Sequence, residues 1–550
     1  MYAGTGWPKV FATAIQAGDA SGLSRMLDRR HFVAGAAAAA LARPALVRAQ
    51  AASTLRFIPV IDLAFPDPIY ATAQVSRTHG FMVFDTLYGM NTKLEISPQM
   101  VEGHSVDNDG RLWTLTLRDG LLWHDGEKVT ARDCVASIRR WARRDAAGDA
   151  LMQATDELSA PDDRTIRFRL KAPFPYLPYA LGKVSAPVCF MMPERLAETD
   201  PFKVIPEVIG SGPFRYKADE RIPGARNVYE RFARYKPRAT GTPDWTSGPK
   251  LIHFDRVEWT TVPDAATGTA AVQAGEQDWQ EAMPHDLLPV VATNKGVRTA
   301  VLDPLGFTCQ MRVNHLQPPF DNPAIRRALL GAIDQEAFMM AVAGDDPAFR
   351  HAPLGYFTPQ TPMASEAGLD LLRGKRDYDK VKRDLKAAGY KGEKVVLLVP
   401  ADSLAQKPLG DIAADVMQKA GMNVEYTALD FGSVLKRRVN KGPSDQGGWN
   451  AFVGNWQGID WLDPLVHSTL RGDGAFPGWV RNEKIEMLRA QWLATGDVPE
   501  QKRICEEIQK VALEEVPYFP IGQYKQPTLY RRDLSGMMKG TPVFWNLKRG

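Results

Sequence analysis

An alternation of helical and strand patterns over residues 378–429 constrains the fold of this chain more than any other stretch. A helical pattern comes first, the apolar run 395–399 follows as a buried strand, and a second helix and a second strand come after it. Each helical pattern ends at a glycine, Gly389 or Gly421, the residue type that most easily takes the left-handed conformation after a helix. This alternation predicts an α/β layer in the second half of the chain.

The length of 550 residues exceeds what one hydrophobic core supports, so we expect two or three domains. Hydrophobic residues make up 44% and charged residues 24% of the chain, which argues against long disordered or polytopic membrane segments. Four cysteines in this length are too few for a disulfide scaffold.

Local patterns predict further elements. Apolar residues alternate with polar ones over 113–117 and 166–170, which indicates two half-buried strands. Thr130 with Asp133 forms a capping-box pattern at the start of a helix, and Asn322-Pro323 begins another. We expect the stretches 221–249 and 352–362, rich in proline and glycine, to be long surface loops.

The basic excess of the chain lies in its first 51 residues. The formal net charge is +4, and residues 1–51 hold six basic and two acidic side chains, which leaves 62 of each sign beyond them. In this segment Arg29-Arg30 precedes the apolar run 32–42, and Ala49-Gln50-Ala51 follows, in the order of a secretory signal peptide. The paired arginines resemble a twin-arginine (Tat) signal.

We therefore expect export to the periplasm with cleavage of residues 1–51. The apolar run is too short to span a bilayer. A basic amphipathic helix at the start of a soluble protein is the alternative, and translation could begin at Met1 or at Met26. Because the charges balance beyond the leader, basicity does not indicate a nucleic-acid partner.

Motifs of catalysis are incomplete. The stretch 103–107 resembles a nucleophile elbow but ends in Asp107 where a glycine is required. The stretch 210–213 is rich in glycine, but Pro213 removes a backbone donor that a phosphate loop uses. H-E-x-x-H and C-x-x-C motifs do not occur. We expect no catalytic residues, no metal site, no cofactor and no enzyme activity.

Six stretches, spread over the chain, resemble motifs that occur together in one protein family. The longest, WTLTLRDGLLWHDGEKVTARDCVASIRRW over residues 113–141, resembles the signature F-x-L-R-x-G-x-x-F-H-D-G-x-P-x-T-A-x-D. The shorter matches cover residues 83–89, 209–214, 274–278, 314–334 and 460–464. The family is the solute-binding proteins of ABC importers in the peptide/nickel class (bacterial extracellular solute-binding family 5). The resemblance covers essentially the whole chain after the leader.

The resemblance implies an α/β, two-lobed periplasmic binding protein of class II (cluster C type), with an extra domain inserted in its first lobe. The first lobe would be formed by residues 52–97, 208–308 and 514–550, the inserted domain by 98–207, and the second lobe by 309–513. Ligand would lie between the lobes and bias a hinge toward closure. The closed form, a monomer, would deliver its ligand to an ABC permease complex in the inner membrane.

The ligand implied by the resemblance is a small peptide or a peptide-like molecule. Its α-ammonium group would pair with Asp460, although one residue more than usual separates Trp456 from this aspartate, and a capping or turn role for it is equally compatible. Aromatic side chains would line the cleft or belong to the lobe core. The other candidate ligand-binding residues are Trp449, Trp456, Trp461, Tyr88, Gly89 and Tyr518.

Other functions stay open at this point. Relatives of this class also bind nickel chelates, haem, opines and oligosaccharides. An extracytoplasmic hydrolase would need serine, histidine and aspartate side chains that converge in one pocket. A ligand-sensing partner of a chemoreceptor is a third possibility.

Overall fold

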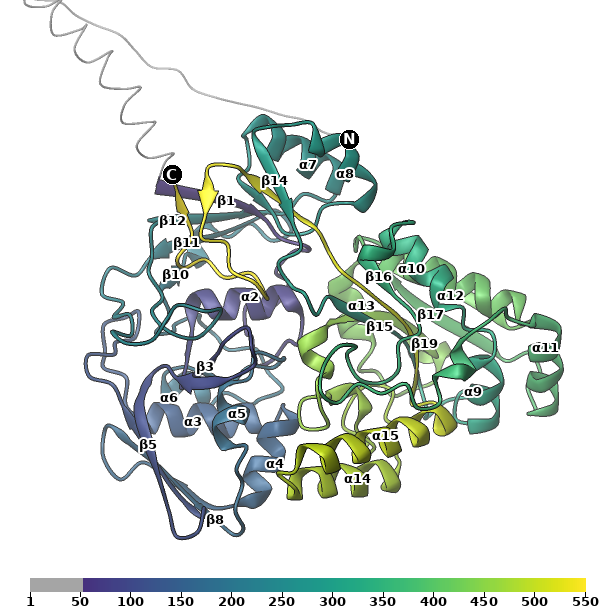
Figure 1. Ribbon diagram of the computed structural model, residues 1–550, viewed down its shortest axis with the longest axis horizontal. Coiled ribbons are helices and arrows are strands. Elements are labelled where there is room, and N and C mark those ends of the chain that lie inside the picture. The colour runs from purple at the N-terminus through teal and green to yellow at the C-terminus, as the bar shows by residue number, and fades with distance from the viewer. Residues whose placement is uncertain (1–52) are drawn as a thin grey trace, which may run out of the picture. The chain divides into compact units, whose positions relative to one another are not determined.

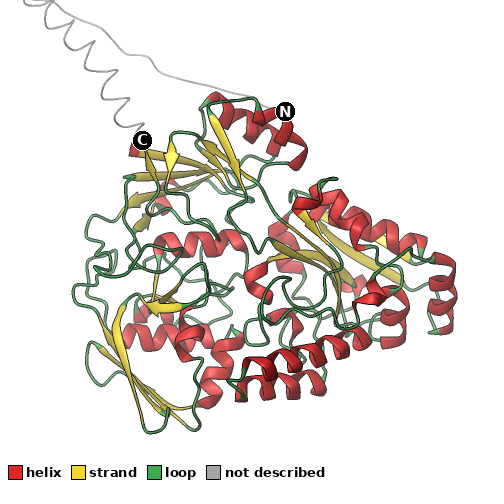
Figure 2. Cartoon of the chain, in the orientation of Figure 1, coloured by secondary structure: helices red, strands yellow, loops and turns green. Residues whose placement is uncertain are grey.

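The computed structural model describes residues 53–550, so the predicted signal peptide lies outside the described residues. Two large mixed sheets and a smaller antiparallel sheet, each with helices packed on it, make up this part of the chain (Figures 1 and 2). Over residues 53–550, no helix is both long and apolar enough to cross a membrane. The four cysteines in this range are buried and unpaired.

The first sheet has seven strands and forms the centre of what we call the first lobe. Strand β1 pairs in parallel with β12 on one side and with β13 on the other. Helix α7 (Ala265–Ala274) connects β12 to β13, as a parallel crossover requires. The strand order is β10 (Phe214–Tyr216), β11 (Arg226–Arg231), β12 (Arg256–Thr260), β1 (Thr54–Ile58), β13 (Trp279–Gln280), β21 (Thr528–Arg531) and β14 (Val297–Ala300).

The second sheet has six strands and forms the centre of the second lobe. Its strand order is β16 (Arg350–His351), β20 (Tyr518–Tyr524), β15 (Phe307–Val313), β19 (Ala451–Gln457), β17 (Lys394–Pro400) and β18 (Asn423–Leu429). Strand β17 is parallel to both of its neighbours and buried on both faces. Its alternate residues pack against α12 (Gln406–Lys419) on one face and against Val434 and Trp449 on the other.

The predicted alternation over residues 378–429 is confirmed. Helix α11 (Tyr378–Ala387) precedes β17, and α12 precedes β18. Gly389 and Gly421 have φ angles of 95° and 85°. After α12, the Gly421 amide donates to the Gln418 carbonyl and the Met422 amide to that of Met417, which is a Schellman motif.

A four-stranded antiparallel sheet lies within residues 98–207. Its order is β5 (Val101–Asp107), β6 (Leu112–Leu117), β8 (Thr165–Leu170) and β7 (Thr155–Ser159), which confirms both predicted strands. Helix α3 (Ala131–Ala142) begins with the predicted capping box of Thr130 and Asp133, and α4 (Ala146–Ala154) follows it.

Other helices cover the second lobe, and short elements complete the first. The second-lobe helices are α9 (Pro323–Leu330), with the predicted cap at Asn322, α10 (Gln335–Ala343), α13 (Phe431–Arg437), α14 (Glu483–Ala494) and α15 (Val498–Glu515). The remaining elements are α2 (Gln74–Val83), β2 (Asp85–Thr86), β3 (Tyr88–Met90), β4 (Ile96–Pro98), α5 (Leu177–Gly182), β9 (Phe190–Met191), α6 (Glu194–Ala197), α8 (Leu288–Ala292), β22 (Leu534–Ser535) and β23 (Lys548–Arg549).

Two chain segments connect the large sheets: residues 301–306 lead from β14 to β15, and residues 525–527 lead back from β20 to β21. The Phe307 and Tyr524 rings stack beside these connections, with centroids 5.2 Å apart. The predicted boundary at residue 514 assigns β20 to the first lobe, whereas its hydrogen bonds place it in the six-stranded sheet. The other predicted domain boundaries stay predictions.

Candidate functional site

A cavity lies between the two large sheets, at the carboxyl ends of parallel strands from both. Val60 and Ile61 follow β1, and Glu281 follows its parallel neighbour β13. From the second lobe, residues 403–406 follow β17, and Gln457 ends β19, which is parallel to it. Backbone N–H groups and side chains converge at such strand ends, and for this reason open α/β sheets bind ligands there.

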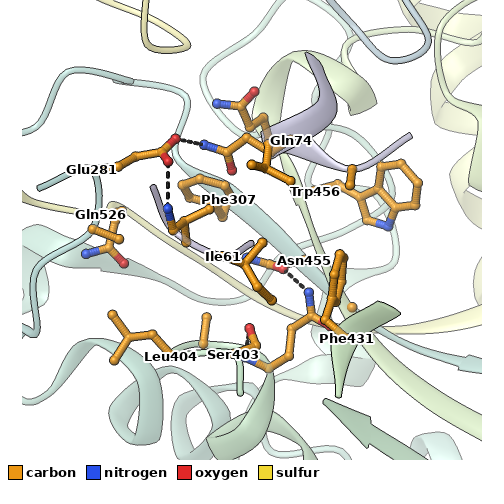
Figure 3. Close-up of a pocket in the computed structure, with 18 of the residues that line it drawn as sticks. Ile61, Gln74, Glu281, Phe307, Ser403, Leu404, Phe431, Asn455, Trp456 and Gln526 are labelled. Atoms are coloured by element: carbon orange, nitrogen blue, oxygen red, sulfur yellow. Dashed lines mark hydrogen bonds between the residues drawn. The ribbon is translucent and has the colours of Figure 1, made fainter. Parts of the chain in front are cut away.

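The cavity wall is mixed in character. Apolar and aromatic side chains, among them Ile61, Phe307, Phe431 and Trp456, lie among polar ones such as Gln74, Glu281 and Asn455 (Figure 3). Gln406 donates to Asn455 Oδ1 at 2.8 Å, so these two amides lie together on the second-lobe side. The lining contains no histidine or cysteine. Among residues 53–550, no group of three or more potential metal-ligating side chains comes together.

Glu281 presents a carboxylate without a cationic partner. Its Oε2 accepts from the Val60 amide at 2.8 Å and its Oε1 from Gln74 Nε2 at 2.7 Å (Figure 3). The residue is 7% exposed and, within the described chain, forms no ion pair. Burial raises the pKa of Glu281 to about 7, and the two hydrogen bonds and the Arg77 charge offset only part of this effect.

Asp303 is the second carboxylate of this kind and lies on the connection between the sheets. Its Oδ1 accepts from the Leu305 amide at 3.0 Å, and its Oδ2 lies 3.4 Å from Gln457 Nε2. No basic side chain in the described part of the chain pairs with it. Burial raises the pKa of Asp303 to about 7. The cavity therefore contains two carboxyl groups that a cation would help to ionise.

Asp460, in contrast, already has a cation. Arg77, from α2 of the first lobe, donates through Nη1 to Asp460 Oδ1 at 2.7 Å and through Nη2 to Gln457 Oε1. The Ala186 amide donates to the same Asp460 oxygen at 2.9 Å. Both side chains of the pair are almost fully buried, although both line the cavity.

Arg438 is a cation of the cavity without an acidic partner in the described residues. It directly follows α13 in the second lobe, and its Nη2 lies 3.4 Å from Thr72 Oγ1 of the first lobe. Its Nε is buried without a hydrogen-bond partner. Burial lowers the pKa of Arg438 to about 10.

The structure brings two of the seven predicted ligand-binding residues, Asp460 and Trp456, into the cavity lining. Trp461 and Tyr518 lie outside the lining in a buried aromatic cluster. The Trp461 ring stacks on that of His467 with centroids 4.7 Å apart, and the Tyr518 hydroxyl lies 2.9 Å from His467 Nε2.

Trp449, Tyr88 and Gly89 also lie outside the lining. Trp449 packs in the core on one face of the six-stranded sheet, and its indole N–H donates to the Arg438 carbonyl at 2.9 Å. The Tyr88 hydroxyl lies 3.0 Å from His104 Nδ1. A Cβ atom on Gly89 would lie 2.3 Å from the Thr246 carbonyl oxygen, so a close backbone approach requires this glycine.

Sequence reasoning did not identify Glu281, Asp303, Arg77 or Arg438. Glu281 lies one residue beyond β13, and Asp303 lies three residues beyond β14. An acidic residue just after a strand was the sequence pattern that could have indicated these two positions as site residues. Strand β13 has only two residues, too few for a recognisable period-two pattern. Arg438 follows another arginine, and nothing local distinguishes the two.

The profile of the bacterial extracellular solute-binding proteins, family 5 (middle), matches residues 95–475. The chain belongs to this family. Over 94% of its length it is 36% identical to the probable peptide ABC transporter periplasmic-binding protein y4tO of Sinorhizobium fredii, 98% of which is covered.

Two solved structures of binding proteins share the fold. Helicobacter pylori DppA in complex with the peptide STSA has a TM-score of 0.74 at 19% identity, with 92% of this chain and 99% of that one covered. AgaA of A. tumefaciens R10 in complex with agropinic acid has the same TM-score and identity, with 90% and 99% covered. The predicted α/β fold of a two-lobed periplasmic binding protein is thereby confirmed.

Family-5 solute-binding proteins are extracytoplasmic components of ABC transport systems and are not enzymes, so this chain is a transport component. The cavity fits that role because its walls come from both lobes. A solute held there contacts both lobes at once, which favours the closed arrangement.

Proposed function

We propose that this family-5 protein captures a small peptide or a peptide-like amine in the cavity and delivers it to its ABC permease complex. The observation that carries the proposal is the pair of carboxyl groups without cations, Glu281 and Asp303. An ammonium group beside either carboxyl group would supply a missing positive charge, and charge-assisted hydrogen bonds in a partly dehydrated site are among the stronger polar contacts.

The rest of the lining suits the remainder of such a ligand. Gln406 and Asn455 offer amide donors and acceptors to a peptide backbone, while Phe431 and Trp456 offer flat apolar contact. Waters between these groups would let one site accept varied side chains. The relative from Sinorhizobium fredii is named a peptide-binding component, and the Helicobacter pylori structure contains a peptide, which supports this ligand class.

For Asp460 we propose a shared role. Its carboxylate holds Arg77 at the cavity wall, and an ammonium group would approach Asp460 only from the face that Arg77 leaves open. Because Arg77 already pairs with Asp460, the arrangement also suits a solute that brings no ammonium group to Asp460. An opine-like solute is therefore the second candidate ligand, and the AgaA structure contains agropinic acid.

Mass spectrometry of the solute released from purified protein tests the proposal directly. We expect a small molecule with a free amine and at least one amide bond. Calorimetry should then show binding of a dipeptide library and much weaker binding of the same library with acetylated N-termini. A released solute without an amine, or equal affinity for the acetylated library, would contradict the proposal.

We also propose that the protein reaches the periplasm by the Tat route, with cleavage of residues 1–51, and acts as a monomer. Replacement of Arg29 and Arg30 by lysine should leave the precursor in the cytoplasm. N-terminal sequencing of the exported protein should begin at or near residue 52, and light scattering should give the mass of one chain.

A further inference from the structure

We propose that the outer side of α11, with the loops at its two ends, binds the anionic lipid headgroups of a membrane. The inference goes beyond the proposed function, because this surface lies outside the cavity lining. It rests on that function only in placing the protein near a complex of the inner membrane. We call the surface the basic face, and its cations are Lys375, Lys380, Lys382, Arg383, Lys386 and Lys391.

The first argument is a local excess of positive charge. Residues 375–391 contain seven basic and three acidic side chains, a net charge of +4. Beyond residue 51 the chain has 62 side chains of each sign, so the remainder of that part has a net charge of −4. A cluster of about four to eight lysines and arginines beside a bilayer is typical of segments that anionic lipid attracts.

The second argument is the packing of α11. Its Val381 and Leu385, four residues apart, are buried in the second-lobe core, and the helix contacts α9. The side chains of residues 382, 383 and 386 point to other sides of the helix and are exposed. Figure 1 shows α11 at the outer edge of the second lobe. The basic face is therefore accessible to a partner.

The third argument is that most of these cations have no counter-charge. Lys380 pairs with Asp384 at 2.5 Å, and Lys382 pairs with Asp379 at 3.4 Å. The other cations of the basic face form no ion pair with any of residues 53–550: Lys375, Arg383, Lys386 and Lys391. Unpaired charges of one sign on one surface produce a potential that attracts the opposite sign.

The fourth argument is an exposed apolar side chain beside these charges. Leu371 is 61% exposed. The guanidinium of Arg376 holds the loop that contains it, because it donates to the Leu371 carbonyl at 3.1 Å and to the Gly374 carbonyl at 2.8 Å. Cations around an exposed leucine suit the boundary between headgroups and acyl chains, where both kinds of side chain find partners.

A lipid surface fits this arrangement better than a single acidic ligand does. The cations are mostly lysines, which bind as point charges on flexible stems and do not form the planar fork of arginine. They come from the helix and from the loops before and after it, so they do not converge on one point. A layer of headgroups presents many negative charges at once to such a face.

Co-sedimentation of the purified mature protein with vesicles tests the proposal. At low ionic strength we expect binding to vesicles of equal parts phosphatidylglycerol and phosphatidylcholine, and little binding to phosphatidylcholine alone. High salt should abolish the binding, since it screens exposed charges. The triple variant Arg383→Gln, Lys386→Gln, Lys391→Gln should bind the anionic vesicles at least about tenfold more weakly.

The matched control removes the same charge from scattered lysines that are also exposed and form no ion pair in the described chain: Lys484→Gln, Lys502→Gln, Lys539→Gln. The control should keep its vesicle binding, and both triple variants should keep the Tm of the wild-type protein. Equal losses of binding in the two triple variants would overturn the proposal. Equal binding of the wild-type protein to the two kinds of vesicle would overturn it too.

A fluorescent label tests which surface touches the lipid. The four cysteines of residues 53–550 are buried, so a polarity-sensitive fluorophore should react with the new thiol of Leu371→Cys. The control is Met487→Cys, because Met487 is 51% exposed and lies on α14. Anionic vesicles should shift the emission to the blue at position 371 and leave it unchanged at position 487. Sedimentation with vesicles without a shift at position 371 would overturn the proposal.

The outcomes also separate the partners and the two proposals. Protection of the basic face from lysine acylation by the permease complex, without binding to anionic vesicles, would indicate an acidic protein surface and refute the lipid assignment. If anionic vesicles bind and no dipeptide does, the peptide proposal fails and the basic face stands. Dipeptide binding without vesicle binding would refute the basic face alone.

Discussion

The protonation of Glu281 is the residue-scale property with the clearest consequence for stability. The folded-state pKa of about 7 lies above the usual value of 4.5, so the folded protein holds this proton more tightly than the unfolded chain does. The free energy of unfolding should therefore fall as the pH rises from about 4.5 to 7, by roughly 1.4 kcal/mol per pKa unit, or about 3 kcal/mol in total.

Glu281→Gln should remove this loss. The difference in unfolding free energy between Glu281→Gln and the wild-type protein should grow by about 3 kcal/mol between pH 4.5 and pH 8. Urea unfolding at several pH values measures this difference in unfolding free energy. Buried histidines such as His79, whose pKa is lowered by burial, affect both proteins equally, so their pH dependence cancels in the difference. A difference that does not change with pH would contradict the assignment.

The same carboxyl group should make solute binding depend on pH. An ammonium group stabilises the ionised form of Glu281, so binding below pH 7 requires the loss of a proton. Affinity should fall by up to tenfold for each pH unit below 7, and Glu281→Gln should bind weakly with a flatter pH profile. Calorimetry in buffers of different ionisation enthalpy would detect the released proton, and no proton release at pH 6 would exclude Glu281 from the contact.

Arg77 and Asp460 permit a double-mutant test, also at the scale of single residues. Asp460→Ala leaves the Arg77 charge buried without its partner and should destabilise the protein by about 3–5 kcal/mol. Arg77→Met likewise leaves the Asp460 charge without its partner, and the double variant Arg77→Met, Asp460→Ala should lose much less than the sum of the two single variants. Urea unfolding of the two single variants and the double variant measures these losses, and additive losses would show that the pair does not form. Solute affinity compared between Arg77→Met with and without Asp460→Ala isolates any direct contact of Asp460.

At the scale of elements, the ends of helices in the second lobe follow local chemistry. Gly421 has a φ angle of 85°, and a Cβ atom added there would have Lys382 Cγ as its nearest neighbour, at 3.5 Å. A side chain at position 421 therefore has space, and only the positive φ angle disfavours residues other than glycine there. Gly421→Ala should cost about 1–2 kcal/mol, and Gly421→Asn less, since asparagine tolerates the left-handed region.

Gly89 provides the contrast for that experiment. There a new Cβ would meet the Thr246 carbonyl oxygen at 2.3 Å, so Gly89→Ala should destabilise through a clash, and asparagine should be worse than alanine. Thermal unfolding of the four variants measures both orders. If alanine and asparagine rank in the same order of stability at both positions, the distinction would be wrong: Gly421 would not be required for its φ angle alone, or Gly89 for lack of space alone.

Two predictions at the scale of elements were wrong. The stretch 221–249 is not a surface loop throughout, because it contains strand β11 and the buried Trp245. The stretch 352–362 includes the buried side chains of Leu354 and Tyr356. Proline and glycine identify irregular backbone correctly, but they do not indicate whether later segments of the chain cover it.

At the scale of the whole molecule, contacts outside the cavity lining join the part with the four-stranded sheet to the second lobe. The Tyr179 hydroxyl, in the part with the four-stranded sheet, donates to Asp463 Oδ2 of the second lobe at 2.8 Å. The Tyr176 ring stacks on that of Trp492, with centroids 5.4 Å apart. Such contacts exist only while this part of the chain lies against the second lobe, so they favour closure independently of the solute.

Tyr179→Phe should therefore weaken solute binding by a few-fold, although Tyr179 does not line the cavity. The matched control is Tyr235→Phe, since Tyr235 also donates to a buried aspartate, Asp85 at 3.1 Å, but within the first lobe. The control should lower stability without an effect on affinity. Calorimetry and unfolding measure the two quantities, and equal affinity losses would contradict a role for Tyr179 in closure.

Local sequence determined the elements and the family of this protein. The caps at Thr130 and Asn322 and the glycines after α11 and α12 act over a few residues, so their structures follow from neighbours in the chain. The motif over residues 113–141 was long enough to indicate the family and, with it, the fold.

The tertiary structure alone decided which charges of the cavity are free. Arg77 and Asp460 are 383 positions apart in the sequence, and the cavity wall contains side chains from strand ends in both lobes. Whether a carboxylate is paired or available to a solute depends on which cation folding brings within about 4 Å of it. The sequence indicated an acidic residue for the site. Folding supplied Asp460 with an arginine, left Glu281 and Asp303 without one, and placed Arg438 without a counter-ion in the same cavity.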